Sequence, residues 1–400
     1  MSRRRHALTL AAWLAPLTFA LATAGPLIAA ATAAGDASAT ATNVAQTATA
    51  ATTTPTGAST TSTATTPAAG KPKSATTTTT TPTATKPATT TPTTTTPTAT
   101  KPATTTAPAK ATLKLFLFGA FFVHGQPLTV PGRGVQVGGV VAPYVPGQWV
   151  TVRALVGRRL IKSDRLLIKP SRTGSFGRFT ETLASSRAGQ LSVTIVHART
   201  AQQVGLLARR TYTVLAENAG FGSTGKFVAL IQQRLAALHF YLPQSGVYDQ
   251  QTGLAIDAYH RLLGWGTDQT LDGKTISYLL DGFGAFKVRY PGDGTHVEGN
   301  LSKQVLALIN GSQVYRIYPI SSGKPSTPTI LGHFHVYSRV PGYLADGMYY
   351  SDFFYNGYAI HGYDPAPDYP ASHGCMRLPI IDAISVFNWL TYGDVVDVYY

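Results

Sequence analysis

The run Ser372-His373-Gly374-Cys375-Met376-Arg377-Leu378 carries the only cysteine of this 400-residue chain. It follows the step Ile360-His361-Gly362 after a short segment that contains prolines. A single cysteine cannot form an internal disulfide, so its thiol is an intermolecular link, a buried core group or a reactive group. The adjoining Ser-His-Gly and the histidine upstream favour the reactive group.

A thiol that acts as a nucleophile at neutral pH needs a base or a cationic neighbour, because the free thiol is mostly protonated. His361 is the predicted base, since alternation along a short strand places it on the same face as the small Ala359. His373 lies only two residues from Cys375, which makes direct contact with the sulfur awkward. The backbone N–H groups of Gly374 and Cys375, at a turn, predict an oxyanion hole.

Arg377 is the predicted anchor for a substrate carboxylate through a bidentate contact. The alternative is that it pairs with Asp364 or Asp382. The aromatic residues expected to bind substrate are Tyr349, Tyr350 and Phe353.

The region from 285 to 400 has the pattern of a mainly β domain. Asn310-Gly311 between two apolar runs predicts a hairpin turn. One helix is expected after the cysteine, with Pro379 in its first turn. Its inward side is expected to carry Ile380, Ala383, Ile384 and Phe387.

This region resembles the L,D-transpeptidase catalytic domain, also called the YkuD-like domain. The resemblance rests on four motifs in matching order and spacing. They are Ser321-Ser322-Gly323-Lys324-Pro325 with Thr327-Pro328-Thr329, Gly332-x-Phe334, Ile360-His361-Gly362, and Ser372-His373-Gly374-Cys375-Met376-Arg377. The sequence departs from the commonest family pattern in its short segment between His361 and Ser372 and in the arginine at 377, where asparagine is frequent.

The resemblance implies that Cys375 attacks the carbonyl of the third residue of a peptidoglycan tetrapeptide stem and releases the terminal D-alanine. The thioester then passes to an amine, forming a 3→3 cross-link, or to water, as in an L,D-carboxypeptidase. It implies a structural hydrogen-bonding role for His373, no metal or organic cofactor, and acylation of Cys375 by carbapenems. The sequence leaves open whether the acceptor is an amine or water.

Two other interpretations compete with an acyl-transfer site. Zinc is one, because His333 and His335 project to one face of a strand and His361, His373 and Cys375 are also metal-capable, although no acidic residue lies at a metal-ligand spacing. The other is a wall-binding protein without catalysis.

The rest of the chain predicts an exported, multidomain protein. Residues 1–34 begin with basic residues followed by an apolar run, which predicts a signal peptide or an uncleaved membrane anchor. Residues 35–111 are rich in Thr, Ala and Pro and predict a disordered linker. The predicted location is outside the cytoplasm, either secreted to the cell wall or tethered to the outer face of the cytoplasmic membrane.

Residues 112–217 predict an immunoglobulin-like β-sandwich, because short apolar runs alternate with Gly and Pro turns. They hold 14 Lys and Arg against three acidic residues, in a chain with a formal net charge of +15. An exported protein seldom meets nucleic acid, so anionic wall polymers or lipid head groups are the expected partners of this charge, and a solvated surface is the alternative.

Residues 218–284 change to a helical period and predict a small three-helix bundle, with Asp249 and Asp272 capping the second and third helices. Leu235-x-x-Leu238 and Gly246-Val247-Tyr248-Asp249 resemble the small peptidoglycan-binding domain, which implies wall binding.

Overall fold

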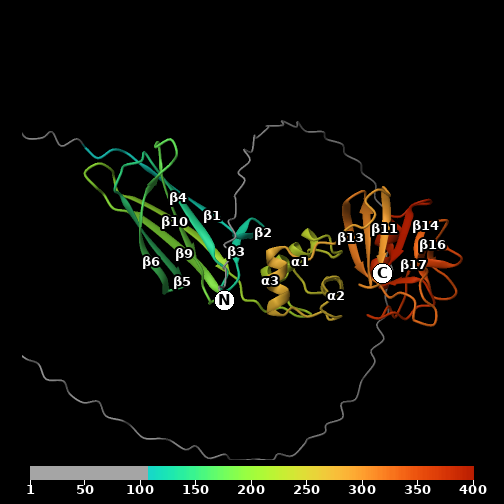
Figure 1. The fold of residues 1–400 in the computed structure, drawn as a ribbon. Helices are drawn as coiled ribbons and strands as arrows, with labels where there is room; N and C mark the ends of the chain where they lie inside the picture. Colours follow the sequence, from blue (N-terminus) through green and yellow to red (C-terminus); the bar gives the residue numbers. More distant parts are fainter. Residues whose placement is uncertain (1–106) are drawn as a thin grey trace, which may run out of the picture. The chain divides into compact units, whose positions relative to one another are not determined.

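The computed structural model describes residues 107–400, all within one compact unit, Pro97–Tyr400 (Figure 1). The predicted signal segment and nearly all of the predicted linker lie outside the described residues. Four helices and 19 strands make up the described part, which confirms the mainly β class. No helix within residues 107–400 is both long and apolar enough to cross a membrane.

The first ten strands form two sheets with a common apolar core, as Figure 1 shows in green and cyan. One sheet has the order β1-β4-β8-β7 and the other β2-β3-β10-β9-β5-β6. Alternation sends every second side chain inward, for example Val150, Val152 and Ala154, all fully buried. The strands are β1 (Thr112–Phe118), β2 (Phe121–Val123), β3 (Gln126–Thr129), β4 (Val135–Ala142), β5 (Trp149–Val156), β6 (Arg159–Leu167), β7 (Lys169–Pro170), β8 (Gly177–Leu183), β9 (Gly189–His197) and β10 (Leu206–Val214).

Three helices follow: α1 (Lys226–Ala237), α2 (Gln250–Leu263) and α3 (Gly273–Asp281). Both capping predictions are confirmed. The Asp249 carboxylate accepts the backbone N–H of Thr252, and the Asp272 carboxylate accepts that of Thr275. Helix α2 contacts the next region through Arg261, whose guanidinium donates to the carbonyls of Gln304 and Ile320 at 3.2 and 2.8 Å. Asp257 neutralises this buried arginine from the preceding helical turn, at 2.6 Å.

The C-terminal region contains two sheets, with orders β13-β12-β11-β19-β14 and β15-β16-β17-β18, around one apolar core. The predicted hairpin is confirmed: Asn310 pairs with Gln313 across a turn in which Gly311 has a φ of 59°. The elements are β11 (Thr295–Asn300), β12 (Val305–Asn310), β13 (Gln313–Pro319), β14 (Gly332–His335), β15 (Ser338–Tyr343), β16 (Tyr349–Tyr355), β17 (Tyr358–Gly362), β18 (Met376–Leu378), α4 (Ile380–Phe387) and β19 (Val395–Tyr399).

Helix α4 is where expected, and its predicted inward side is confirmed in part. Ala383 is buried and Ile380 and Phe387 are half-buried, but Ile384 is 40% exposed, and Asp382 and Val386 are buried instead. Pro379 caps the helix from just outside its first turn. The spacing of apolar residues did not predict the burial of Asp382, because a carboxylate is expected on the exposed side of a helix.

Candidate active site

Strands β17 and β18 run parallel and bring the two halves of the site together. His361 pairs in register with Arg377, one step along from Ile360 and Met376. Ile360 and Met376 point into the core, so alternation places His361 and Arg377 on the opposite face. Cys375 directly precedes β18 and, two residues before Arg377, belongs to that same face.

The hydrogen bonding of His361 defines its tautomer. The side chain is buried, and its Nδ1 lies 2.9 Å from the carbonyl oxygen of Gly362. A carbonyl only accepts, so Nδ1 carries the proton and the lone pair is on Nε2. Burial lowers the pKa of His361, and the Arg377 charge lowers it further, while the Gly362 hydrogen bond and Asp346 oppose this. The imidazole is therefore a neutral base with Nε2 available.

The Cys375 thiol is half-buried, with Sγ 3.8 Å from the carbonyl oxygen of Gly357. Burial raises the pKa of Cys375, against the opposing effects of the Ala359 backbone and the Arg377 charge. Both shifts favour the uncharged forms of the two groups, the thiol and the imidazole. If His361 acts as the base for Cys375, it would take up the thiol proton during attack by sulfur, because burial disfavours a preformed thiolate.

Ser372 holds the turn that presents the cysteine. Its buried hydroxyl donates to the Cys375 carbonyl at 2.6 Å and accepts the Gly374 N–H at 3.0 Å. Gly374 has a φ of 123°, and a Cβ there would overlap the ring of Tyr358. The predicted oxyanion hole stays a prediction: of its two N–H groups, that of Gly374 donates to Ser372, whereas that of Cys375 makes no hydrogen bond within residues 107–400.

The segment from Ser321 to Thr329 packs against this turn. Ser372 N donates to the Ser322 carbonyl at 3.0 Å, and the Thr327 hydroxyl donates to the Ser372 carbonyl at 3.0 Å. His373 is exposed and its Nε2 lies 3.3 Å from Lys324 Nζ. His373 therefore links the two loops through Lys324.

Arg377 is not paired with either carboxylate considered from the sequence. Its guanidinium carbon lies 3.9 Å from the centre of the Tyr363 ring, and its buried Nε has no hydrogen-bond partner within the described residues. Asp364 is exposed, and Asp382 is buried 3.5 Å from Gln251. The arginine thus keeps donors available beside His361.

The three aromatic residues expected to bind substrate are placed differently. Phe353 pairs with Ala359, so it shares the face of His361. Tyr349 lies opposite Gly362, and Tyr350 packs edge-on against Phe387 of α4, with ring centres 5.0 Å apart. The structure therefore brings Phe353 toward the catalytic face and places Tyr350 against the helix.

Sequence reasoning missed Tyr358 and Asp346. Tyr358 supports Gly374, and the Asp346 carboxylate raises the pKa of both His361 and Cys375. Tyr358 directly precedes Ala359, so alternation places it on the face of Ile360, opposite His361, and the strand pattern gave no signal of its contact with Gly374. Asp346 comes from a distant loop, and no spacing in the sequence signals its position.

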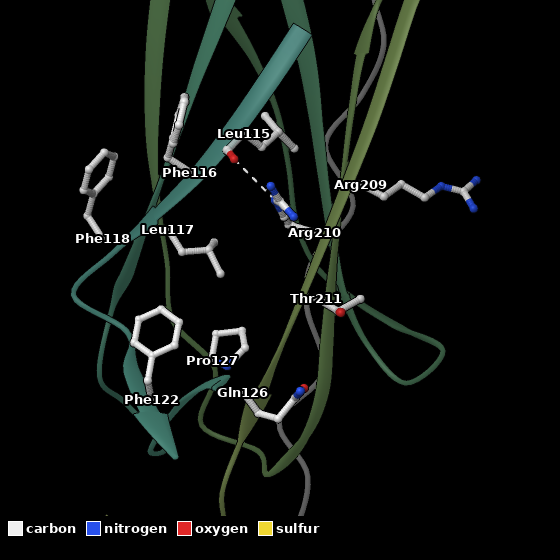
Figure 2. A pocket seen from close by; sticks show the side chains of 10 residues that line it. All are labelled: Leu115, Phe116, Leu117, Phe118, Phe122, Gln126, Pro127, Arg209, Arg210 and Thr211. Carbon is white, nitrogen blue, oxygen red and sulfur yellow. Dashed lines mark hydrogen bonds between the residues drawn. The ribbon is translucent and has the colours of Figure 1, made fainter. Parts of the chain in front are cut away.

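A hollow of about 590 Å³ lies on the N-terminal sheets, lined by β1, β2, β3 and β10 (Figure 2). Phe116, Phe118 and Phe122 line it, each about half exposed. Arg210 lies beside them and donates to the Leu115 carbonyl at 3.3 Å, whereas Arg209 extends away, as Figure 2 shows. This hollow lies on a separate sheet pair from Cys375.

The C-terminal region is similar to known protein domains. A model of the YkuD family, the L,D-transpeptidase catalytic domain, matches residues 294–398. An L,D-transpeptidase from Xylanimonas cellulosilytica is 31% identical, covering 45% of this chain and 97% of that chain, with a TM-score of 0.41. The catalytic domain of Enterococcus faecium L,D-transpeptidase is 27% identical over 27% of this chain and 98% of that chain, with a TM-score of 0.24. An L,D-transpeptidase from Mycobacterium tuberculosis is 20% identical over 27% of this chain and 58% of that chain, with a TM-score of 0.25.

No curated protein matches the chain. The β-rich C-terminal region is a transpeptidase-type enzyme domain. The chain belongs to the L,D-transpeptidase family through residues 294–398.

Proposed function

We propose that this protein is an exported bacterial L,D-transpeptidase of peptidoglycan biosynthesis, with Cys375 as its acyl-accepting nucleophile. One observation carries the proposal. In a domain that matches the family, the buried His361 donates its Nδ1–H to Gly362, and its Nε2 has no hydrogen-bond partner among residues 107–400. It lies on the strand paired with β18, which Cys375 directly precedes.

The reaction begins when the Cys375 sulfur attacks the carbonyl of the third residue of a tetrapeptide stem. His361 Nε2 takes the thiol proton as the S–C bond forms, and the Cys375 N–H stabilises the oxyanion. Collapse of the tetrahedral intermediate breaks the C–N bond to D-alanine, whose nitrogen receives the proton from His361. The amine of a second stem then attacks the thioester, His361 accepts its proton, and the thiol regains that proton as the 3→3 bond is made.

The remaining site residues position the substrate and the turn. Ser372 and Gly374 hold the cysteine turn, His373 links it to Lys324, and Arg377 is the proposed anchor of a stem carboxylate. Tyr349, Tyr350 and Phe353 stay predictions as substrate residues, with Phe353 favoured by its place on the catalytic face.

The second candidate is an L,D-carboxypeptidase, in which water replaces the acceptor amine at the same site. Incubation with a disaccharide-tetrapeptide, followed by mass spectrometry of the products, separates the two. A cross-linked dimer with one D-alanine lost supports transfer, and tripeptide alone supports hydrolysis. Neither product should form with Cys375→Ala, and either product from that variant would contradict the nucleophile.

The other regions are proposed to bring the enzyme to its substrate. Residues 218–284 are proposed as a peptidoglycan-binding module, and the basic sandwich, proposed as immunoglobulin-like, as a contact for anionic wall polymers. Residues 1–34 are proposed to direct export or to tether the protein to the membrane. A purely wall-binding protein would bind isolated cell wall but would form no covalent adduct at Cys375.

A further inference from the structure

A row of ionisable side chains crosses the sheet that contains β11, β14 and β19, away from Cys375. Asp397 pairs in register with Glu298 of β11 on one side and His333 of β14 on the other. The neighbours of Asp397 along the strand, Val396 and Val398, point into the catalytic core. Alternation therefore places Asp397 on the opposite face of this sheet.

Asp397 is fully buried, and its Oδ2 has neither a hydrogen-bond nor an ion-pair partner within residues 107–400, while its Oδ1 contacts only His333. A buried carboxylate with incomplete partners is unfavourable, so such groups are paired or coordinate metals. His333 Nδ1 contacts Asp397 Oδ1 and lies 3.5 Å from Asp293 Oδ2. Donor atoms of these three residues all lie within 4.8 Å of one another.

Glu298 fixes the segment that supplies Asp293. Its Oε1 accepts the backbone N–H groups of Arg289 and Tyr290, each at 2.7 Å, and its Oε2 accepts the Tyr399 hydroxyl at 2.7 Å. The Tyr290 ring then packs edge-on against His333, with centres 4.7 Å apart. Glu298 is therefore fully engaged, and its role is to hold Asp293 and His333 together.

We propose that His333, Asp293 and Asp397 bind a divalent transition-metal cation of the zinc class. Two ligands of one Zn²⁺, each about 2.0–2.2 Å from the metal, lie about 3.3 Å apart, close to the spacing of His333 and Asp293. His333 Nδ1 and Asp397 Oδ1 are in closer contact than two zinc ligands, so metal binding would separate these two atoms. One imidazole and two carboxylates are a donor set that this class of metal accepts. His333 is 56% exposed, which gives the ion a path to the site and leaves coordination positions for water.

The competing interpretation is a simple imidazolium–carboxylate pair between His333 and Asp397. Such a pair supplies a donor to one oxygen of Asp397 and none to the other. A metal also accounts for Asp293, which brings a second carboxylate to the same imidazole nitrogen. The expected role is structural, because the ion would tie the edge strand β14 to the segment before β11.

His335 provides a matched control. It lies on the same strand and is also exposed, but its Nδ1 bonds to the Gly393 carbonyl at 3.1 Å. The full chain carrying Cys375→Ala, which removes the thiol as a competing ligand, is treated with chelator and titrated with ZnCl₂ by calorimetry. We expect one equivalent to bind with micromolar or tighter affinity, and about 100-fold weaker binding in His333→Ala and Asp397→Asn. His335→Ala should bind like the parent.

Absence of binding in the parent, unchanged affinity in His333→Ala, or an equal loss in His335→Ala would overturn the proposal. If Asp397→Asn does not fold, Asp293→Asn at the half-buried position takes its place, with circular dichroism to verify folding. A second readout is the melting temperature, which Zn²⁺ should raise in the parent but not in His333→Ala. None of these measurements depends on catalysis, so their outcome tests the metal site and leaves the proposed function untouched.

Discussion

At the scale of single residues, the site joins a base whose pKa is lowered to a thiol whose pKa is raised. Burial is the main cause of both shifts, because it disfavours the imidazolium and the thiolate alike. The two neutral groups hold one proton that must move when substrate arrives. This differs from a preformed thiolate–imidazolium pair, in which the thiol would already be ionised.

The rate of Cys375 alkylation by iodoacetamide should therefore depend on two ionisations. The acid limb should lie below the ordinary histidine pKa of 6.5, because His361 is easier to deprotonate than a free imidazole. A further rise should appear only above the ordinary thiol pKa of 9.0. In His361→Ala, the rise of the alkylation rate below pH 6.5 should disappear, whereas the rise above pH 9.0 should remain. An unchanged profile in that variant would contradict the role of His361 as base.

Ser372→Ala should leave the Cys375 carbonyl and the Gly374 N–H without their partner. Each unsatisfied buried group costs about 1–3 kcal/mol, so we expect acylation of the thiol to slow by about tenfold or more. Stopped-flow acylation with a chromogenic β-lactam measures this. Thr327→Val, which removes a hydroxyl from the adjacent loop, is the matched control and should have a smaller effect. Equal rates in Ser372→Ala and the unmodified protein would show that the turn does not need this hydroxyl.

At the scale of elements, helix α4 packs against β16 and β17 and carries a buried carboxylate, Asp382. Burial raises the pKa of Asp382 to about 7 and has the same effect on Asp352, also to about 7, despite its bond to Arg339. Both groups hold a proton in the folded state that they release when unfolded at mildly acidic pH. The folded protein is thus stabilised by protonation.

The melting temperature should consequently fall as pH rises from about 4 to about 7, because the folded state binds more protons than the unfolded state across this window. Asp382→Asn should make this slope shallower, leaving the parts that Asp352 and Asp397 contribute, since burial raises their pKa values to about 7 and about 6. Asp364→Asn, at an exposed position, should not change it. Calorimetric scans of the three proteins at several pH values test this, and a slope that is equal in all three would contradict the protonated state of Asp382.

Much at this scale was predictable from sequence, and the failures have a common physical cause. Local rules located the hairpin at Asn310-Gly311 and the caps Asp249 and Asp272, because each depends on neighbours within a few residues. The inward face of α4 and the acidic partners of His333 depend on contacts between distant segments. The role of the motifs around Cys375 was predicted from their resemblance to a known family. The hydrogen bond from the Gly374 N–H to Ser372 was seen only in the structure.

At the scale of the whole molecule, basic charge and catalysis lie in different regions of the sequence. The sandwich carries 14 Lys and Arg against three acidic residues. If this charge contacts anionic wall polymers, binding of the protein to isolated cell wall should weaken as salt rises, because exposed charges are screened. The rate of carbapenem acylation at Cys375 should change little over the same range.

A matched pair of variants tests this division. Replacement of the exposed Arg158 and Arg159 by Gln should weaken wall binding at low salt, while Cys375→Ala should leave wall binding unchanged and abolish acylation. Wall binding in pull-downs that is indifferent to both salt and the arginine changes would contradict the electrostatic contact and favour a merely solvated surface.

The central proposal is an activated, acyl-accepting thiol, and intact-mass spectrometry after incubation with a carbapenem tests it most directly. We expect a single adduct on the unmodified protein, none on Cys375→Ala, and much slower formation on His361→Ala. A folded, unmodified protein that forms no adduct, or an adduct that persists in Cys375→Ala, would contradict the proposal.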